Sequence, residues 1–158
     1  MDFTLRLAET KAKAVMARNP EAVIIGADTV VTVDDHMLGK PDDPKDAVRM
    51  LTLLSGRWHK VITGLCLLET AHQQSFCQVC TTEVQFAVLS EEEIKSYIVT
   101  GEPMDKAGAY GIQERGALFI RQIHGCYFNV VGFPVRLFYE MWRQIHAEFP
   151  SITDQRYL

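Results

Sequence analysis

The sequence has little of what a membrane-spanning, secreted or nucleic-acid-binding protein needs. Its longest apolar runs fall far short of the roughly 20 residues that cross a bilayer. Its first residues show no basic stretch followed by an apolar core, so no signal peptide is expected. A formal net charge of -4 lacks the basic footprint of a duplex-binding protein. We therefore expect a cytoplasmic protein that binds neither membrane nor nucleic acid.

Cysteine is also scarce, with four in the chain, at Cys66, Cys77, Cys80 and Cys126. Without a secretion signal they belong to a reducing cytosol, where we expect free thiols. Cys77 and Cys80 have the spacing of a zinc knuckle. However, residues i and i+3 of a strand face opposite sides of a sheet, and no second cysteine pair follows. The sequence therefore disfavours a zinc site.

The chain is otherwise an ordinary globular sequence. It has 158 residues, of which 47% are hydrophobic and 23% are charged. A chain of this length buries roughly two-thirds of the surface that its unfolded form exposes, which suffices for a stable core without disulfides or structural metal ions. No repeat or linker interrupts it. We expect a single domain over residues 1–158.

Periodicity and capping residues predict four helices. Asp43 is a helix N-cap, and Pro44 stands at the first helical position after it. Ser90 and Glu93 form a capping box ahead of another apolar run. The first predicted helix covers residues 4–19. The second begins after residue 43 and ends at Gly56, and the third begins after residue 90 and ends at Gly101. The last begins at residue 134.

Apolar runs and alternation predict the strands. The first is the continuous run over residues 22–33, followed by a turn over residues 34–39. Residues 58–70 and 75–89 are two long strands joined as a hairpin. Residues 117–123 and 126–131 are expected to form a second hairpin about His124 and Gly125.

Asp28 interrupts the apolar run of the first strand. Burying an unpaired carboxylate costs several kcal/mol of hydration, so Asp28 needs a partner. Lys11 on the first helix and Lys40 before Pro41 stand where a ligand could meet the backbone. Each residue alone is commonly structural, as a turn, a cap or a solvated side chain. Together they suit polyphosphate hydrolysis, in which lysines offset phosphate charge while the carboxylate binds a divalent cation or takes a proton from water.

Residues 105–113 form a second candidate site, Asp-Lys-Ala-Gly-Ala-Tyr-Gly-Ile-Gln. Its small residues let the backbone come close to a ligand, and its amides could cradle phosphate or ribose. Gln113 offers one acceptor and two donors, which suits reading the edge of a base. The alternative is a glycine-rich connector capped by Asp105.

These segments resemble the Maf family of nucleoside triphosphate pyrophosphatases nearly end to end. The most specific parts of the resemblance are residues 26–29 followed by 39–41, and residues 105–113. Thr29 and the Tyr-Gly-Ile-Gln sequence that ends at Gln113 resemble the branch that hydrolyses dTTP and UTP. A third interpretation, hydrolysis of 7-methyl-GTP, is disfavoured by the same two residues.

The resemblance implies an α/β fold, in which a mixed, partly antiparallel sheet is flanked by helices and forms a nucleotide-binding cleft. It makes Asp28 the general base or the metal-binding carboxylate, with Lys11 and Lys40 on the triphosphate. Thr29 and Gln113 would help select the base. Water would attack the α-phosphorus with Mg²⁺ or Mn²⁺ bridging phosphate oxygens. The other substrate-binding residues implied are Asp105, Lys106 and Tyr110.

The sequence departs from the family pattern in two places. Family members usually open with an apolar strand and a Ser/Arg-rich loop, and this chain starts after them. A shortened, catalytically silent domain that binds nucleotide or a protein partner is therefore the second hypothesis. Glu114 follows Gln113 where the family often has glycine, which places a negative charge beside the expected pocket. An open sheet edge and the apolar last helix favour a homodimer.

Overall fold

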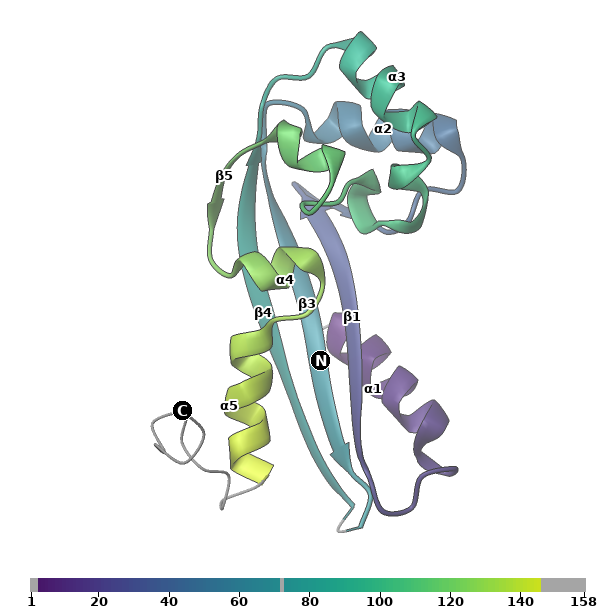
Figure 1. The fold of residues 1–158 in the computed structure, drawn as a ribbon, viewed down its shortest axis with the longest axis vertical. Coiled ribbons are helices and arrows are strands. Elements are labelled where there is room, and N and C mark those ends of the chain that lie inside the picture. The colour runs from purple at the N-terminus through teal and green to yellow at the C-terminus, as the bar shows by residue number, and fades with distance from the viewer. Residues whose placement is uncertain (1–2, 72, 146–158) are drawn as a thin grey trace.

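A five-stranded antiparallel sheet runs through the length of the molecule, in the order β2-β1-β3-β4-β5 (Figure 1). The structure is a computed structural model that describes residues 3–71 and 73–145. The strands are β1 (Val23–Val33), β2 (His36–Leu38), β3 (Trp58–Glu69), β4 (Gln74–Phe86) and β5 (Ile120–His124). The helices are α1 (Phe3–Met16), α2 (Pro44–Leu54), α3 (Glu91–Val99), α4 (Tyr127–Val131) and α5 (Val135–Ile145), with 3₁₀ turns η1 (Glu102–Asp105), η2 (Ala107–Ala109) and η3 (Arg115–Phe119).

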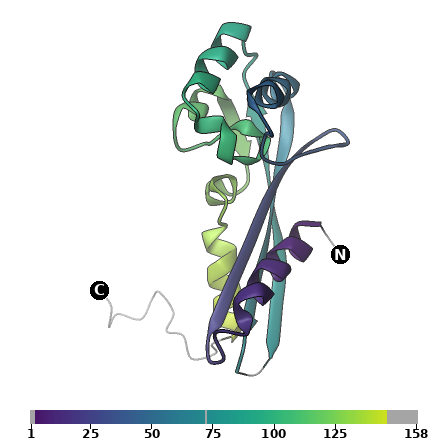
Figure 2. The same cartoon turned by 90° about the vertical axis from the view of Figure 1, so that its right-hand side faces the viewer.

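Helices cover the two faces of the sheet (Figure 2). Successive side chains of β3 point to opposite faces, as the pleat requires. Leu65 and Leu67 pack with Met141 of α5 on one face. Cys66 and Leu68 pack with α1 on the other. The continuous apolar run of β3 therefore serves two small cores.

The third and largest core lies at the other end of the sheet, under α2 and α3 (Figure 1). The side chain of Asp43 accepts a hydrogen bond from the backbone of Asp46, which caps the start of α2. Leu51 and Leu54 on its inner face are fully buried against the ends of the strands. Phe86 lies at the centre of this core and contacts the rings of His59 and Tyr110.

Two glycines let α1 lie directly on the sheet. A Cβ added at Gly26 of β1 would stand 2.1 Å from the Ala8 carbonyl oxygen. A Cβ added at Gly64 of β3 would stand 2.5 Å from the Thr4 carbonyl carbon and oxygen. Since real contacts are never so short, only glycine permits this approach. The packing fixes which residues of α1 face β1.

Most of the predicted architecture is confirmed. The α/β fold, the capped helix after Asp43, the capping box of Ser90 and Glu93 and the long β3-β4 hairpin are present. A mixed sheet was expected, but every strand pair in the described ranges is antiparallel. Short connections impose this on the β1-β2 and β3-β4 pairs, because parallel neighbours need a long crossover. The expected turn over residues 34–39 contains the short strand β2.

The predicted hairpin of residues 117–123 and 126–131 is wrong in its second strand, because α4 forms there, and the first strand begins only at Ile120, after η3. The Thr82 hydroxyl accepts a hydrogen bond from the Cys126 amide and donates one to the Cys126 carbonyl, both at 3.1 Å. The buried Asn129 amide donates to Thr82 Oγ1 and to the Val61 carbonyl, each at 3.0 Å. These contacts with β3 and β4 bring the segment back over the sheet as one helical turn.

The expectation of four free thiols is wrong for one pair. Cys66 and Cys77 stand directly opposite each other in the β3-β4 register, and they form a disulfide. Cys80 and Cys126 have free thiols. Register decided this outcome, since the chain separates the paired cysteines by 11 positions. Among the described helices, none is long and apolar enough to cross a membrane.

Substitution Gly64→Ala is expected to loosen α1 from the sheet. The added Cβ would overlap the Thr4 backbone, and overpacking of this kind lowers the free energy of unfolding by roughly 1–3 kcal/mol. Denaturant unfolding checks this. Gly39→Ala is the matched control, because a Cβ there meets no atom of the described residues within 4 Å. Equal stabilities of the two variants would contradict the role given to Gly64.

Candidate active site

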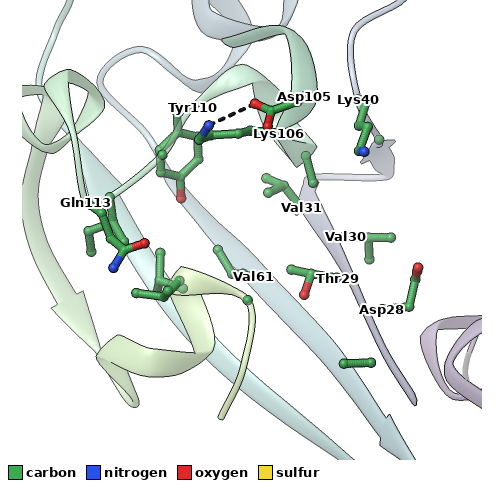
Figure 3. A pocket seen from close by; sticks show the side chains of 18 of the residues that line it. Asp28, Thr29, Val30, Val31, Lys40, Val61, Asp105, Lys106, Tyr110 and Gln113 are labelled. Atoms are coloured by element: carbon green, nitrogen blue, oxygen red, sulfur yellow. Dashed lines mark hydrogen bonds and ion pairs between the residues drawn. The ribbon is translucent and has the colours of Figure 1, made fainter. Parts of the chain in front are cut away.

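An open cavity of about 570 Å³ lies beside β1, between α1, the 105–113 segment and the end of α4 (Figure 3). The short strand β2 pairs only with residues 31–33 of β1. Within the described chain the edge of β1 around Asp28 is therefore open toward the cavity. All of the site residues expected from the sequence line it, namely Lys11, Asp28, Thr29, Lys40, Asp105, Lys106, Tyr110 and Gln113.

The partner that Asp28 needs is Lys11. The ammonium of Lys11 donates a hydrogen bond to Asp28 Oδ1 and forms an ion pair with it. The Asp28 side chain is only 13% exposed, whereas that of Lys11 is 60% exposed. The carboxylate is thus held in place from α1, and the ammonium still has open sides on which to meet an anion.

The turn that carries Lys40 is joined to the second candidate segment. The Gly108 amide donates to the Gly39 carbonyl at 2.9 Å. Gly108 adopts φ +71° and approaches Val31 so closely that a Cβ would lie 2.9 Å from its Cγ2 atom. Only glycine combines this backbone conformation with this approach. The contact brings residues 105–113 beside Lys40.

Charge pairing organises this side of the cavity. The Lys106 ammonium donates to Asp105 Oδ1 at 2.8 Å. This hydrogen bond lowers the pKa of Asp105, and the nearby charge of Lys40 adds to the effect. The same bond raises the pKa of Lys106. Both groups therefore stay ionised at neutral pH.

Thr29 faces the other side of β1 from Asp28, because neighbouring residues of a strand point to opposite faces. Its hydroxyl lies 2.8 Å from the Thr63 hydroxyl. Gly132, after α4, lies close on the same side, since a Cβ there would be 3.9 Å from Thr29 Oγ1. The cavity thus extends around the edge of β1 and meets Asp28 on one face and Thr29 on the other (Figure 3).

Tyr110 lines the cavity, but its hydroxyl contacts a residue of the core. The Tyr110 hydroxyl lies 2.8 Å from His59 Nε2 in the core, and only 5% of the residue is exposed. Burial raises the pKa of Tyr110. The hydroxyl is therefore neutral and already engaged. Gln113 and Glu114, in contrast, are exposed at the rim.

Several other residues, to which the sequence pattern assigned no individual role, line or support the cavity. Phe3 and Val131 add apolar surface to the cavity. Asn129 holds α4 beneath it through its two hydrogen bonds. Glu102 accepts hydrogen bonds from the amides of Arg115 and Gly116. Local patterns do not reveal Glu102, because these partners follow it by 13 and 14 positions.

A divalent cation fits the residues present only with help from a substrate. Within the described chain, no three His, Cys, Asp or Glu side chains are close enough together to hold a metal. Mg²⁺, however, commonly binds through one or two carboxylates, several waters and the phosphates of a substrate. Asp28, at the open edge of β1, satisfies that requirement.

Comparison with known proteins identifies the family. The model of the Maf-like protein family matches residues 1–145. The chain belongs to the Maf family. Among similar proteins, the dTTP/UTP pyrophosphatase of Carboxydothermus hydrogenoformans is 52% identical over 144 residues, which cover 91% of this chain and 77% of that protein.

Other Maf relatives show the same degree of similarity. The dTTP/UTP pyrophosphatase of Bacillus velezensis is 55% identical over 129 residues, covering 82% of this chain and 67% of the relative. The dTTP/UTP pyrophosphatase of Thermococcus onnurineus is 51% identical over 139 residues, which cover 88% of this chain and 74% of that protein. The family predicted from residues 26–29, 39–41 and 105–113 is confirmed.

The buried His59 predicts acid sensitivity of this Maf domain. Burial lowers the pKa of His59 to about 4, against 6.5 when unfolded. Between these values the unfolded chain binds a proton that the folded chain does not. His59 therefore leaves the free energy of unfolding unchanged above about pH 6.5. As the pH falls from there to 4, His59 lowers the free energy of unfolding by about 3 kcal/mol in total.

Unfolding by urea at pH 7, 5.5 and 4.5 measures this dependence. His59→Gln should flatten the loss of stability with falling pH, whatever its stability at pH 7. The control is His36→Gln, which replaces an exposed histidine on β2. An unchanged pH dependence in His59→Gln would show that another group causes the sensitivity.

Proposed function

We propose that this chain is a nucleoside triphosphate pyrophosphatase that hydrolyses dTTP and UTP to the monophosphate and pyrophosphate. One observation carries the proposal, namely that the Asp28–Lys11 pair, Lys40 and the 105–113 segment line a single cavity. Membership of the Maf family supports it, as do three relatives named dTTP/UTP pyrophosphatases at 51–55% identity.

The triphosphate would lie along the open edge of β1. Lys11 and Lys40 approach this edge from different elements, α1 and the turn after β2, and their ammonium groups would offset charge on the phosphates. Fixed charges of this kind stabilise the additional negative charge that develops as the phosphoanhydride bond breaks. Asp28, held by Lys11, would either orient the attacking water and accept its proton or bind a divalent cation.

The charges that line the cavity favour a divalent cation. Three lysines, Lys11, Lys40 and Lys106, are matched there by three carboxylates, Asp28, Asp105 and Glu114. A triphosphate brings several further negative charges that this balance leaves uncompensated. In the second of its two alternative roles, Asp28 would hold Mg²⁺ or Mn²⁺ together with the phosphate oxygens. When bound, the ion supplies charge neutralisation and polarises the α-phosphorus toward attack.

The base would lie on the other side of β1 from the reacting phosphate. Asp28 and Thr29 are adjacent but face opposite ways, so they meet different parts of one nucleotide. Thr29 and the exposed amide of Gln113 both line the cavity and offer hydrogen bonds to a pyrimidine edge. Tyr110 lines the same cavity.

A substrate panel tests the proposal. Pyrophosphate release would be measured with dTTP, UTP, CTP, GTP and 7-methyl-GTP, each with Mg²⁺ or Mn²⁺. Turnover of dTTP and UTP above the others is expected. A preference for 7-methyl-GTP would overturn the substrate choice. No turnover by a folded chain would instead favour the catalytically silent domain that binds nucleotide or a partner.

The proposal includes a homodimer in the cytoplasm, with residues 1–158 as one domain. Exposed apolar side chains at Phe128 and Val135, where α4 leads into α5, support a self-contact. Light scattering on the purified chain measures its molar mass. A monomeric mass at micromolar concentration would refute the dimer without affecting the catalytic proposal.

Replacing Asp28 with asparagine should abolish turnover. Asp28→Asn keeps the shape of the side chain but removes the charge that binds metal or accepts a proton, so kcat is expected to fall roughly 10²–10⁴-fold. Asp34→Asn is the control, because it removes the exposed ion pair with Arg57 away from the cavity. Pyrophosphate release by folded Asp28→Asn at the wild-type rate would exclude Asp28 from the mechanism.

A further inference from the structure

Glu102 has a carboxylate that is bonded from three directions, although none of the proposed catalytic steps uses it. Its Oε1 atom accepts hydrogen bonds from the Tyr97 hydroxyl at 2.7 Å and from the Gly116 amide at 3.2 Å. Its Oε2 atom accepts one from the Arg115 amide at 3.2 Å. The carboxylate thus joins α3, η1 and the start of η3.

Tyr97 extends this contact to a second point. Its hydroxyl accepts a hydrogen bond from the Gly111 amide at 3.2 Å while it donates to Glu102. The side chain is almost fully buried, with 3% of the residue exposed. Burial, and the carboxylate of Glu102 next, raise the pKa of Tyr97, so the hydroxyl keeps the proton that it donates.

The two anchored amides bracket the residues that meet the cavity. Gly111 and Gly116 lie on either side of Ile112, Gln113 and Glu114, and all three of these residues line it. Gly116 is packed so tightly that a Cβ would lie 2.5 Å from the Gly111 carbonyl oxygen and 2.8 Å from the Tyr97 hydroxyl. The loop is therefore closed on itself over the Tyr97–Glu102 pair.

A glutamine side chain alone cannot distinguish uracil from cytosine. Uracil and thymine present an acceptor where cytosine presents a donor, and a glutamine amide carries both groups and can turn to suit either base. Discrimination requires that the amide be held in one orientation. That depends on the backbone which carries Gln113, and Glu102 and Tyr97 anchor this backbone at both ends.

We propose that Glu102 and Tyr97 are positioning residues that hold the Gln113 loop and thereby set the preference for uracil and thymine over cytosine. The inference rests on the proposed function, since it deepens the role of Gln113 at the same site. Neither residue is placed on the reacting phosphate. Their loss should therefore change base selection more than the rate of the chemical step.

Glu102→Gln is the first test. The glutamine side chain keeps the size of the glutamate, but its NH₂ group replaces the oxygen that accepts from the Arg115 backbone amide. Two donors then face each other, and this hydrogen bond is lost. The ratio of kcat/KM for UTP to that for CTP should fall about tenfold, the factor that one hydrogen bond to a charged group contributes. KM for UTP should rise while kcat stays near the wild-type value.

Tyr97→Phe is a second, independent variant. It removes the hydroxyl that accepts a hydrogen bond from the Gly111 amide but keeps the ring, which packs edge-on against Phe119. Tyr97→Phe should also lower the ratio of kcat/KM for UTP to that for CTP. In the double variant this ratio should fall by less than the product of the two single-variant factors, because the two residues act as one unit. Glu92→Gln, which changes an exposed glutamate of α3, is the control.

Hydrogen exchange of the Gly111, Arg115 and Gly116 amides tests the loop without any substrate. Exchange should be slow in the wild-type chain and at least about tenfold faster in Glu102→Gln. Unchanged exchange, an unchanged UTP-to-CTP ratio, or an equal loss of kcat on every substrate would overturn the inference. A wild-type chain with slow exchange but no turnover would refute the proposed function while leaving the anchored loop in place.

Discussion

The close contact between α1 and the sheet is the constraint on which the site depends. Gly26 and Gly64 leave no Cβ between the helix backbone and the two strands, so α1 lies lower on the sheet than ordinary side chains allow. From that position Lys11 reaches Asp28 at the open edge of β1. The ion pair compensates a carboxylate that is mostly removed from water, and burying it alone would cost several kcal/mol. The close packing of α1 on the sheet therefore also positions the ion pair of the candidate site.

A second close backbone contact completes the cavity from the opposite side. The bond between Gly108 and Gly39 draws the 105–113 segment against the turn that carries Lys40. Two segments more than 60 residues apart in the sequence thus present their charges to one space. The pleat of β1 then divides that space, because Asp28 and Thr29 face opposite sides of the strand. One end of the cavity suits phosphate, and the other end suits a base.

Features set by local sequence were predictable. The Asp43 cap and the capping box at Ser90 each act within a few residues, and the structure has both. The apolar run around Asp28 likewise indicated that this carboxylate needs a partner, although that partner, Lys11, lies 17 positions away. Features set by tertiary contact were not. The segment after Cys126 reads as a strand by composition, yet Thr82 and Asn129 hold it as α4. The disulfide needs the β3-β4 register, and the role of Glu102 needs partners far along the chain.

The central claim is that water attacks the α-phosphorus of a nucleoside triphosphate held beside Asp28. It is tested most directly by hydrolysing UTP in water labelled with heavy oxygen and locating the label by mass spectrometry. The proposed geometry predicts that the label enters UMP and that unlabelled pyrophosphate is released. Label in pyrophosphate, or release of inorganic phosphate with UDP, would contradict it, because the attack would then fall on another phosphorus.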